Sequence, residues 1–144
     1  MSSTIIIPSF QYKTFRIFEN HTPQLPMNIE ELREYCLLKK GVTESLPFND
    51  TALVFKVIDK MFALLDISEE NRGISLKCDP DLAPELREHY PEITPAYHFN
   101  KKHWNTIIID SSIPDKLIKE WIDHSYDEVV KGLTKKDREE LNRN

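Results

Sequence analysis

The sequence predicts a two-layer α+β domain in which an antiparallel-rich sheet carries its helices on one face. Three observations lead to this fold class. Short segments alternate apolar and polar residues as strands do, longer segments repeat apolar residues at helical spacing, and the elements follow in the order α-β-β-β-α-β-β-α. With 144 residues, the chain has the length of one domain.

Residues 1–26 differ in composition from the rest of the chain, so we expect the domain to comprise residues 27–144. The first segment contains three prolines and no amphipathic repeat. A helix start follows directly after Met27, which favours Met27 as the natural first residue and residues 1–26 as a dispensable extension. The alternative is an extra strand, which would use Phe10, Tyr12, Phe15 and Ile17.

Two helices have clear ends in the sequence. The first is predicted from Asn28, as its N-cap, to near Lys40, because Gly41 suits the left-handed residue that ends a helix. The last is predicted to have Ser112 as its N-cap and to carry an apolar stripe as far as Leu133. A charged helical tail is expected to follow it.

Five segments have the composition or alternation of strands, and a short helix separates the third from the fourth. Two connections are short enough for hairpins, namely Asp59-Lys60 and Asn100-Lys101-Lys102. Helices on one face leave the other face of the sheet open. The strands are expected at 51–58, 61–67, 73–78, 94–99 and 103–110, and the short helix at 79–90.

The motifs argue against an enzyme and against a bound metal or cofactor. The three glycines lie far apart, so they form no phosphate-binding loop, and there is no G-x-S-x-G nucleophile elbow. Cys36 and Cys78 each fall on the apolar side of their element, as buried thiols do. His98 and His103 flank one short loop without the H-x-x-x-H spacing of metal ligands. We expect no catalytic residues.

The charge and hydropathy of the chain bound its location and partners. No segment has the length and composition of a signal peptide or of a membrane span, so a cytoplasmic protein with no membrane partner is expected. The net charge of −5 repels a polyanion unless the positive side chains gather on one face.

Residues 97–106 interleave basic, aromatic and amide side chains at a predicted hairpin. Lysines neutralise phosphates, and planar side chains stack on bases. Lys56 and Lys77 have the strand parity opposite to their apolar neighbours, so they can extend a positive patch onto the open sheet face. The alternative is that Phe99 and Trp104 are core residues and that the lysines only keep a hairpin tip soluble.

The chain also resembles the MmcQ/YjbR family over residues 27–140. The resemblance implies an α+β fold of the type compared with secretion chaperones and frataxin-like domains, and it implies DNA binding through a double-wing arrangement of hairpins. Its matching segments include Leu46-Pro47-Phe48, Phe55-Lys56-Val57, Lys60-Met61-Phe62-Ala63, Ser75-Leu76-Lys77-Cys78 and Pro95 to Thr106.

Under the DNA-binding hypothesis, sequence specificity is low because no recognition helix is evident. The competing hypothesis is a protein- or peptide-binding module that accepts an extended chain on the open sheet. The partner is then DNA or a protein, and the chain is a monomer or a weak homodimer. Ser125 and Tyr126 are interpreted as a core hydrogen-bonding step of the last helix. For DNA, we expect Lys56, Lys60, Lys77, Lys101 and Lys102 to contact phosphates and His98, Asn100 and Trp104 to position the hairpin.

Overall fold

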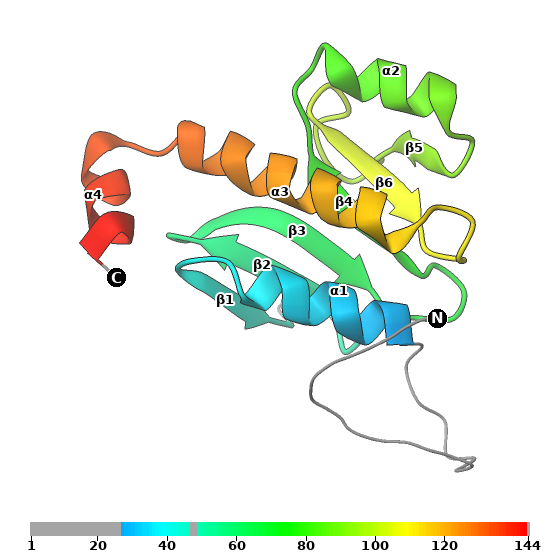
Figure 1. Ribbon diagram of the computed structural model, residues 1–144, viewed down its shortest axis with the longest axis horizontal. Coiled ribbons are helices and arrows are strands. Elements are labelled where there is room, and N and C mark those ends of the chain that lie inside the picture. Colours follow the sequence, from blue (N-terminus) through cyan, green and yellow to red (C-terminus); the bar gives the residue numbers. More distant parts are fainter. Residues whose placement is uncertain (1–26, 47–48, 144) are drawn as a thin grey trace.

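A computed structural model describes residues 27–46 and 49–143, which form six strands and four helices (Figure 1). The expectations for residues 1–26 lie outside the described residues. The strands are β1 (Val42–Ser45), β2 (Ala52–Val57), β3 (Lys60–Asp66), β4 (Gly73–Lys77), β5 (Ile93–Pro95) and β6 (Trp104–Ile108). The helices are α1 (Met27–Leu37), α2 (Leu82–His89), α3 (Asp115–Lys131) and α4 (Lys135–Arg143).

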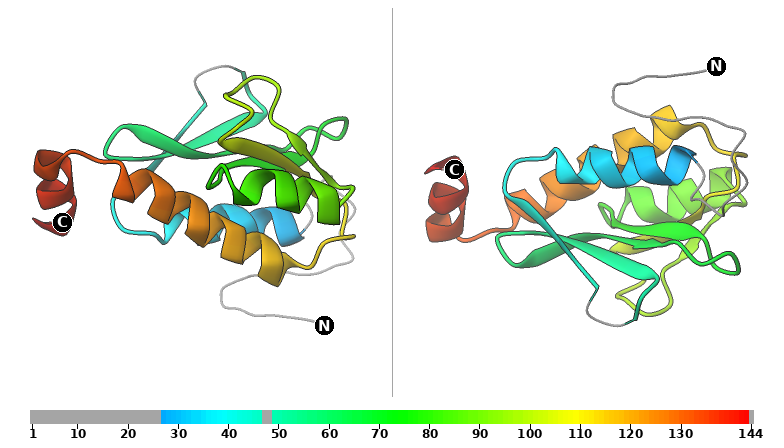
Figure 2. Two further views of the ribbon diagram at one scale, coloured as in Figure 1. Left: turned by 90° about the horizontal axis from the view of Figure 1, so that it is seen from above. Right: turned by 90° about the horizontal axis from the view of Figure 1, so that it is seen from below.

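The six strands form one sheet in the order β1-β2-β3-β4-β6-β5, and every neighbouring pair is antiparallel. Helix α3 crosses β3 and β4, α1 packs beside α3, and α2 covers β5 and β6. The edge-on views place these three helices on the same side of the sheet (Figure 2). The predicted α+β fold class is therefore confirmed.

The core lies between the sheet and the helices. Phe55 and Phe62 of the sheet and Ile118 and Ile122 of α3 are all at most 1% exposed. The T-shaped contact between the rings of Phe62 and Tyr126 adds a specific aromatic contact to this apolar layer. In the described part of the chain, no helix is long and apolar enough to cross a membrane.

The predicted element order lacked β1 and did not separate α4 from α3. Strand β1 contains a single apolar residue, Val42, and pairs with β2 at the sheet edge, so its sequence carries little of the alternation that indicates a strand. The observed order is α-β-β-β-β-α-β-β-α-α, because the chain turns after α3 at Gly132 and the charged tail forms its own helix.

The first predicted hairpin turn was misplaced, and the second hairpin has a longer loop than predicted. The β2–β3 turn uses Ile58 and Asp59, with φ of +45° and +63°, in place of Asp59-Lys60. Two positive φ angles match the twist of a two-residue hairpin. Isoleucine rarely adopts a positive φ, so the sequence pattern does not indicate Ile58 as a turn residue. Strand β5 ends at Pro95 because the amide of Phe99 donates to the carbonyl of Ala96 at 3.0 Å, which closes a turn inside the predicted strand.

Helix α1 has different bounds from those predicted. It already includes Met27, so Asn28 lies in its first turn, and it ends at Leu37 rather than near Lys40. Gly41 follows with φ of +73°, the left-handed conformation expected of it. An added Cβ there would lie 2.5 Å from Cδ1 of Leu141, so the Leu141 side chain of α4 would have to move.

Ser112 does not cap α3, contrary to the prediction. Its amide and its hydroxyl both donate to Oδ1 of Asp110, at 3.0 and 2.5 Å, which forms a turn before the helix. The helix begins at Asp115, and Pro114 occupies its N-cap without a side-chain hydrogen bond.

Candidate functional site

The open face of the sheet is the side turned away from α1, α2 and α3, and strand alternation decides which side chains it carries. Leu53, Phe55 and Val57 of β2 point into the core, so Val54 and Lys56 between them point to the open face. The same alternation places Lys77 and Trp104 on that face, because Leu76 of β4 and Asn105 of β6 point toward the helices.

Two lysines and a tryptophan share one row of the open face. Lys56 is directly opposite Met61 of β3, and Lys77 is directly opposite Trp104 of β6. Since β3 lies between β2 and β4, the Lys56 and Lys77 backbones are two strand spacings apart, or about 10 Å, with an offset of about one residue along the strands at the bulge in β3. We call these four residues, Lys56, Met61, Lys77 and Trp104, the lysine row.

Residues 96–103, here called the aromatic loop, lie beside the end of the lysine row. The amide of Ala96 donates to the carbonyl of Trp104 at 3.1 Å, and the amide of Cys78 donates to that of His103 at 2.6 Å. The ring of Phe99 stacks on Trp104 with centroids 4.9 Å apart and an interplanar angle of 27°. These contacts connect the loop directly to β4 and β6.

Tyr97 is the most exposed aromatic side chain of the described residues, with 68% of its surface accessible. The Lys101 ammonium lies 5.0 Å from the centroid of the Tyr97 ring, within cation–π range. The aromatic loop thus presents an exposed ring with a positive charge beside it.

Helix α2 fixes the aromatic loop through two polar side chains that were not among the predicted site residues. Nη1 of Arg87 donates to the Lys101 carbonyl at 3.2 Å and to Oδ1 of Asn105 at 2.7 Å. Nδ2 of Asn105, which is 2% exposed, donates to the Ala83 carbonyl at 3.3 Å. One signal was present in the sequence, because Asn105 shares the strand parity of Ile107 and a polar residue at a core position needs partners.

The predicted site residues separate into three groups. Lys56, Lys77 and Trp104 lie together in the lysine row, and His98, Lys101 and Lys102 are in the adjoining aromatic loop, all three exposed. Asn100 is also in this loop, but Oδ1 of Asn100 accepts the Lys102 amide at 3.0 Å and so shapes the turn.

Lys60 lies apart from the lysine row. Lys60 is opposite Val57, a core residue, so its side chain has the parity of the helix side at the tip of the β2–β3 hairpin.

The alternative interpretation held that Phe99 and Trp104 are core residues. In the structure they are not. Both are half-buried, and neither belongs to the core cluster or packs against it. The open face also carries apolar side chains farther along the strands: Leu64 is half-buried, and Ile108 is 43% exposed.

The charges are divided between the two layers of the molecule. Among strand residues, the open face carries Lys56, Lys77 and one acid, Asp66, which lies at the opposite end of the strands from the lysine row. The aromatic loop adds Lys101 and Lys102 and no acid. Helices α1, α2 and α3 together carry ten carboxylates and five lysine or arginine side chains. The helix layer therefore carries an excess of five negative charges.

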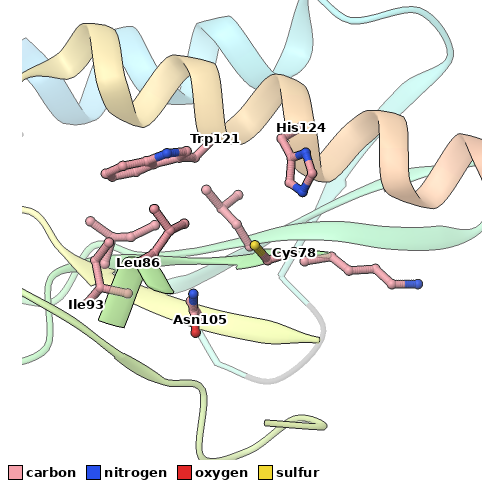
Figure 3. Close-up of a pocket in the computed structure, with 9 residues that line it drawn as sticks. Cys78, Leu86, Ile93, Asn105, Trp121 and His124 are labelled. Carbon is pink, nitrogen blue, oxygen red and sulfur yellow. The ribbon is translucent and has the colours of Figure 1, made fainter. Parts of the chain in front are cut away.

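A small cavity lies on the helix side, between α2, α3 and the sheet. His124 points from α3 toward Cys78, and the ring of Trp121 lies over Leu86 of α2 and Ile93 of β5 (Figure 3). Its volume of about 10 Å³ is enough for one water molecule at most. A small-molecule ligand would not fit there without movement of the helices.

The buried polar and thiol groups behave as structural residues. Ser125 is fully buried; its hydroxyl accepts the Lys77 amide at 2.8 Å and donates to the Phe62 carbonyl at 2.5 Å, as predicted for a core hydrogen-bonding step. Burial raises the pKa of Cys36 to about 12 and that of Cys78 to about 11. Among the described residues, no group of three or more His, Cys, Asp or Glu could hold a metal ion.

A family model and several known proteins are similar to this chain. The family model named YjbR matches residues 37–128. The Escherichia coli K12 protein named "Uncharacterized protein YjbR" is 37% identical over 115 residues, which cover 80% of this chain and 98% of that protein. The E. coli O157:H7 protein named "Uncharacterized protein YbdF" is 39% identical over 98 residues, 66% of this chain and 78% of that protein.

Solved structures share the fold. The crystal structure of Deinococcus radiodurans protein DR2400, described as a DUF419 domain, has a TM-score of 0.73 and 42% sequence identity over 79% of this chain and 87% of that chain. The crystal structure of a Pseudomonas syringae protein has a TM-score of 0.58 and 32% identity over 69% of this chain and 96% of that chain.

Proposed function

This chain belongs to the YjbR family, and from the arrangement of its open face we propose that it is a non-enzymatic binding domain that holds DNA with little sequence specificity. The observation that carries the proposal is the alignment of Lys56 and Lys77 with Trp104 in one row, beside a loop that adds Lys101 and Lys102. Lysines at these positions suit phosphates, and the aromatic residues suit bases or sugars.

The division of charge supports the proposal although the net charge is −5. A polyanion that approaches the helix layer meets an excess of carboxylates, whereas the lysine row and the aromatic loop together present four lysines and contain no acid. Such a separation orients the molecule during encounter and concentrates binding on one face.

Low sequence specificity follows from the elements that border this face. Reading bases in the major groove requires a helix or a two-stranded ribbon that enters the groove. Helices α1, α2 and α3 lie on the other side of the sheet, and the aromatic loop is held close to the sheet by its hydrogen bonds. Contacts from this face therefore go mainly to the backbone.

The proposal is tested by fluorescence anisotropy of a labelled DNA oligonucleotide titrated with the full chain at several salt concentrations. The test variant replaces Lys56, Lys77, Lys101 and Lys102 with glutamine. The matched control replaces four exposed lysines of α3 and α4, Lys116, Lys131, Lys135 and Lys136, with glutamine. Both variants change the net charge from −5 to −9, because each substitution removes one positive charge.

We expect the test variant to lose binding and the control to keep it. If all four lysines contact phosphates of a single strand, the logarithm of the affinity falls with the logarithm of the salt concentration at a slope of about −3. Equal losses in the two variants would reject the lysine row as the binding surface, and absence of binding at low salt would reject the proposed function.

A second candidate function is a protein-interaction module that uses the same face. The apolar surface of Met61, Leu64 and Ile108, the last 43% exposed, favours this alternative because an extended peptide could pack against it. Such binding would tolerate salt and would be weakened by Ile108→Lys, whereas DNA binding would not.

A further inference from the structure

Resting on the proposed function, we infer that the open face prefers single-stranded over duplex DNA and that Tyr97 is the platform on which an unpaired base stacks. The inference begins from exposure. A 68% exposed tyrosine leaves most of its ring to solvent, although burial of aromatic surface is favourable. The Lys101 ammonium lies 5.0 Å from the centroid of this ring.

The other aromatic side chains near the lysine row are already engaged. Phe99 and Trp104 stack on each other, so one face of each ring is covered and both side chains are half-buried. Tyr97 is therefore the ring that remains available to a base, and stacking needs only the π-face that every base has.

The surroundings of Tyr97 provide a matching phosphate contact. The Lys101 ammonium lies 5.0 Å from the ring centroid, so a base stacked on Tyr97 has a positive charge within reach of its own or its neighbour's phosphate. The Lys102 side chain is exposed one residue further on. Ring and charge are adjacent, as single-strand binding sites require.

The loop that holds Tyr97 is pre-shaped, which lowers the entropic cost of binding. Its turns are closed by the Phe99 amide to the Ala96 carbonyl and by the His103 amide to the Asn100 carbonyl, both at 3.0 Å. Arg87 holds the Lys101 carbonyl from α2. The ring is thus displayed on a fixed loop.

Duplex DNA cannot use this arrangement, because its bases are paired and stacked on each other. Only its phosphates would be available to the lysines, and the Tyr97 ring would gain no partner. A single strand can offer phosphates to Lys56 and Lys77 and a base to Tyr97 at the same time. The expected difference is therefore in the stacking contribution, which is about 1–3 kcal/mol per base in such sites.

The test compares three labelled probes of equal length at one salt concentration: a 20-nucleotide single strand, the same strand as a duplex, and a single strand of abasic sites. The proteins are the full chain, Tyr97→Ala and Tyr97→Phe, which keeps the ring. Leu38→Ala is the control, because Leu38 is 83% exposed and directly follows α1.

We expect Tyr97→Ala to weaken single-strand binding about tenfold, with no change for the duplex or the abasic strand. Tyr97→Phe and Leu38→Ala should stay within twofold of the unchanged protein. Equal affinity for all three probes, or an unaltered single-strand affinity in Tyr97→Ala, would overturn this inference and leave the proposed function standing. Absence of binding to every probe would instead overturn the proposed function.

Discussion

The Ser125 hydroxyl lies where the hydrogen-bond ladder between β3 and β4 opens. The ladder ends at the pair Ala63 and Leu76, so Phe62 and Lys77 would form the next pair. Instead, the Lys77 amide donates to the Ser125 hydroxyl, which donates to the Phe62 carbonyl. One side chain of α3 thereby satisfies two backbone groups at the start of the lysine row.

Ser125→Ala should lower the free energy of unfolding by about 2–3 kcal/mol, because it leaves an amide and a carbonyl without partners next to the core. The change is measured as a shift in the urea midpoint at constant slope. Ser45→Ala, an exposed change on the edge strand, should alter stability by less than about 0.5 kcal/mol. A loss as small in Ser125→Ala would mean that β3 and β4 close the gap directly.

Tyr35 forms a second polar contact at residue scale, between α1 and α3. Its hydroxyl donates to the Asp123 carboxylate at 2.7 and 2.9 Å, and Lys39 pairs with the same carboxylate while lying over the Tyr35 ring. Burial, and then the hydrogen bond to Asp123, raise the pKa of Tyr35 to about 12. The fold therefore favours the protonated phenol.

This shift predicts a loss of stability in alkali. Between the ordinary tyrosine pKa of about 10 and the folded value of about 12, the unfolded chain releases a proton that the folded chain keeps. The stabilisation from Tyr35 is complete below pH 10 and decreases as the pH rises through this window. Urea titrations of the unchanged protein and Tyr35→Phe from pH 8 to pH 12 measure it. The difference in stability should shrink above pH 10, and a constant difference would contradict the assignment.

At the scale of elements, α2 acts as the support of the aromatic loop. Arg87 is the only described side chain that joins the helix to both the loop backbone and β6, through Lys101 and Asn105. Asn105 completes the connection by its contact with the Ala83 carbonyl at the start of α2. The loop therefore depends on a helix that precedes it in the chain and contributes no residue to the open face.

Arg87→Met should loosen the loop while the aliphatic packing of the helix is retained. Trypsin provides the measurement, because the loop contains the cleavable pair Lys101 and Lys102. We expect cleavage after these lysines to be several-fold faster in Arg87→Met than in the unchanged protein, and Glu88→Gln, an exposed neighbour, should leave the rate unaltered. Equal rates in all three proteins would show that the loop is held without Arg87.

The elements differ in how far the sequence predicts them. Strands β2 to β4 and helix α3 were predicted because many residues share one periodicity, and the parity of Lys56 and Lys77 then placed both on the open face. Strand β1 was missed because it depends on pairing at the sheet edge. The β2–β3 turn was misplaced because it depends on a left-handed backbone conformation at Ile58.

The contacts that hold the aromatic loop were harder to predict than the loop itself. Lysines and aromatic residues cluster between residues 97 and 106, so the composition indicates the loop. The contribution of Arg87 depends on where α2 packs, and short sequence patterns do not specify packing between elements. Tyr97 and Phe99 differ in their exposure to solvent, because the Phe99 ring stacks on Trp104 and the Tyr97 ring does not.

At the scale of the whole molecule, one core cluster joins the sheet to α1, α3 and α4. Cys36 of α1 is fully buried within this cluster, whereas Cys78 is 4% exposed, follows β4 and lies outside the cluster beside the small cavity. The two thiols therefore report on different parts of the fold. Their raised pKa values leave few thiolates at pH 8, so labelling requires opening of the structure.

Labelling with a thiol reagent at pH 8 should distinguish local from global opening. In Cys78→Ala, the remaining Cys36 should react only at the rate allowed by global unfolding, and its protection should equal the urea-derived free energy of that variant. In Cys36→Ala, Cys78 should react faster than global unfolding allows, because β4 and α2 separate at the cavity before the core opens. Equal protection of both thiols would instead mean that the sheet and its helices open as one unit, which would make the aromatic loop and its support as stable as the core.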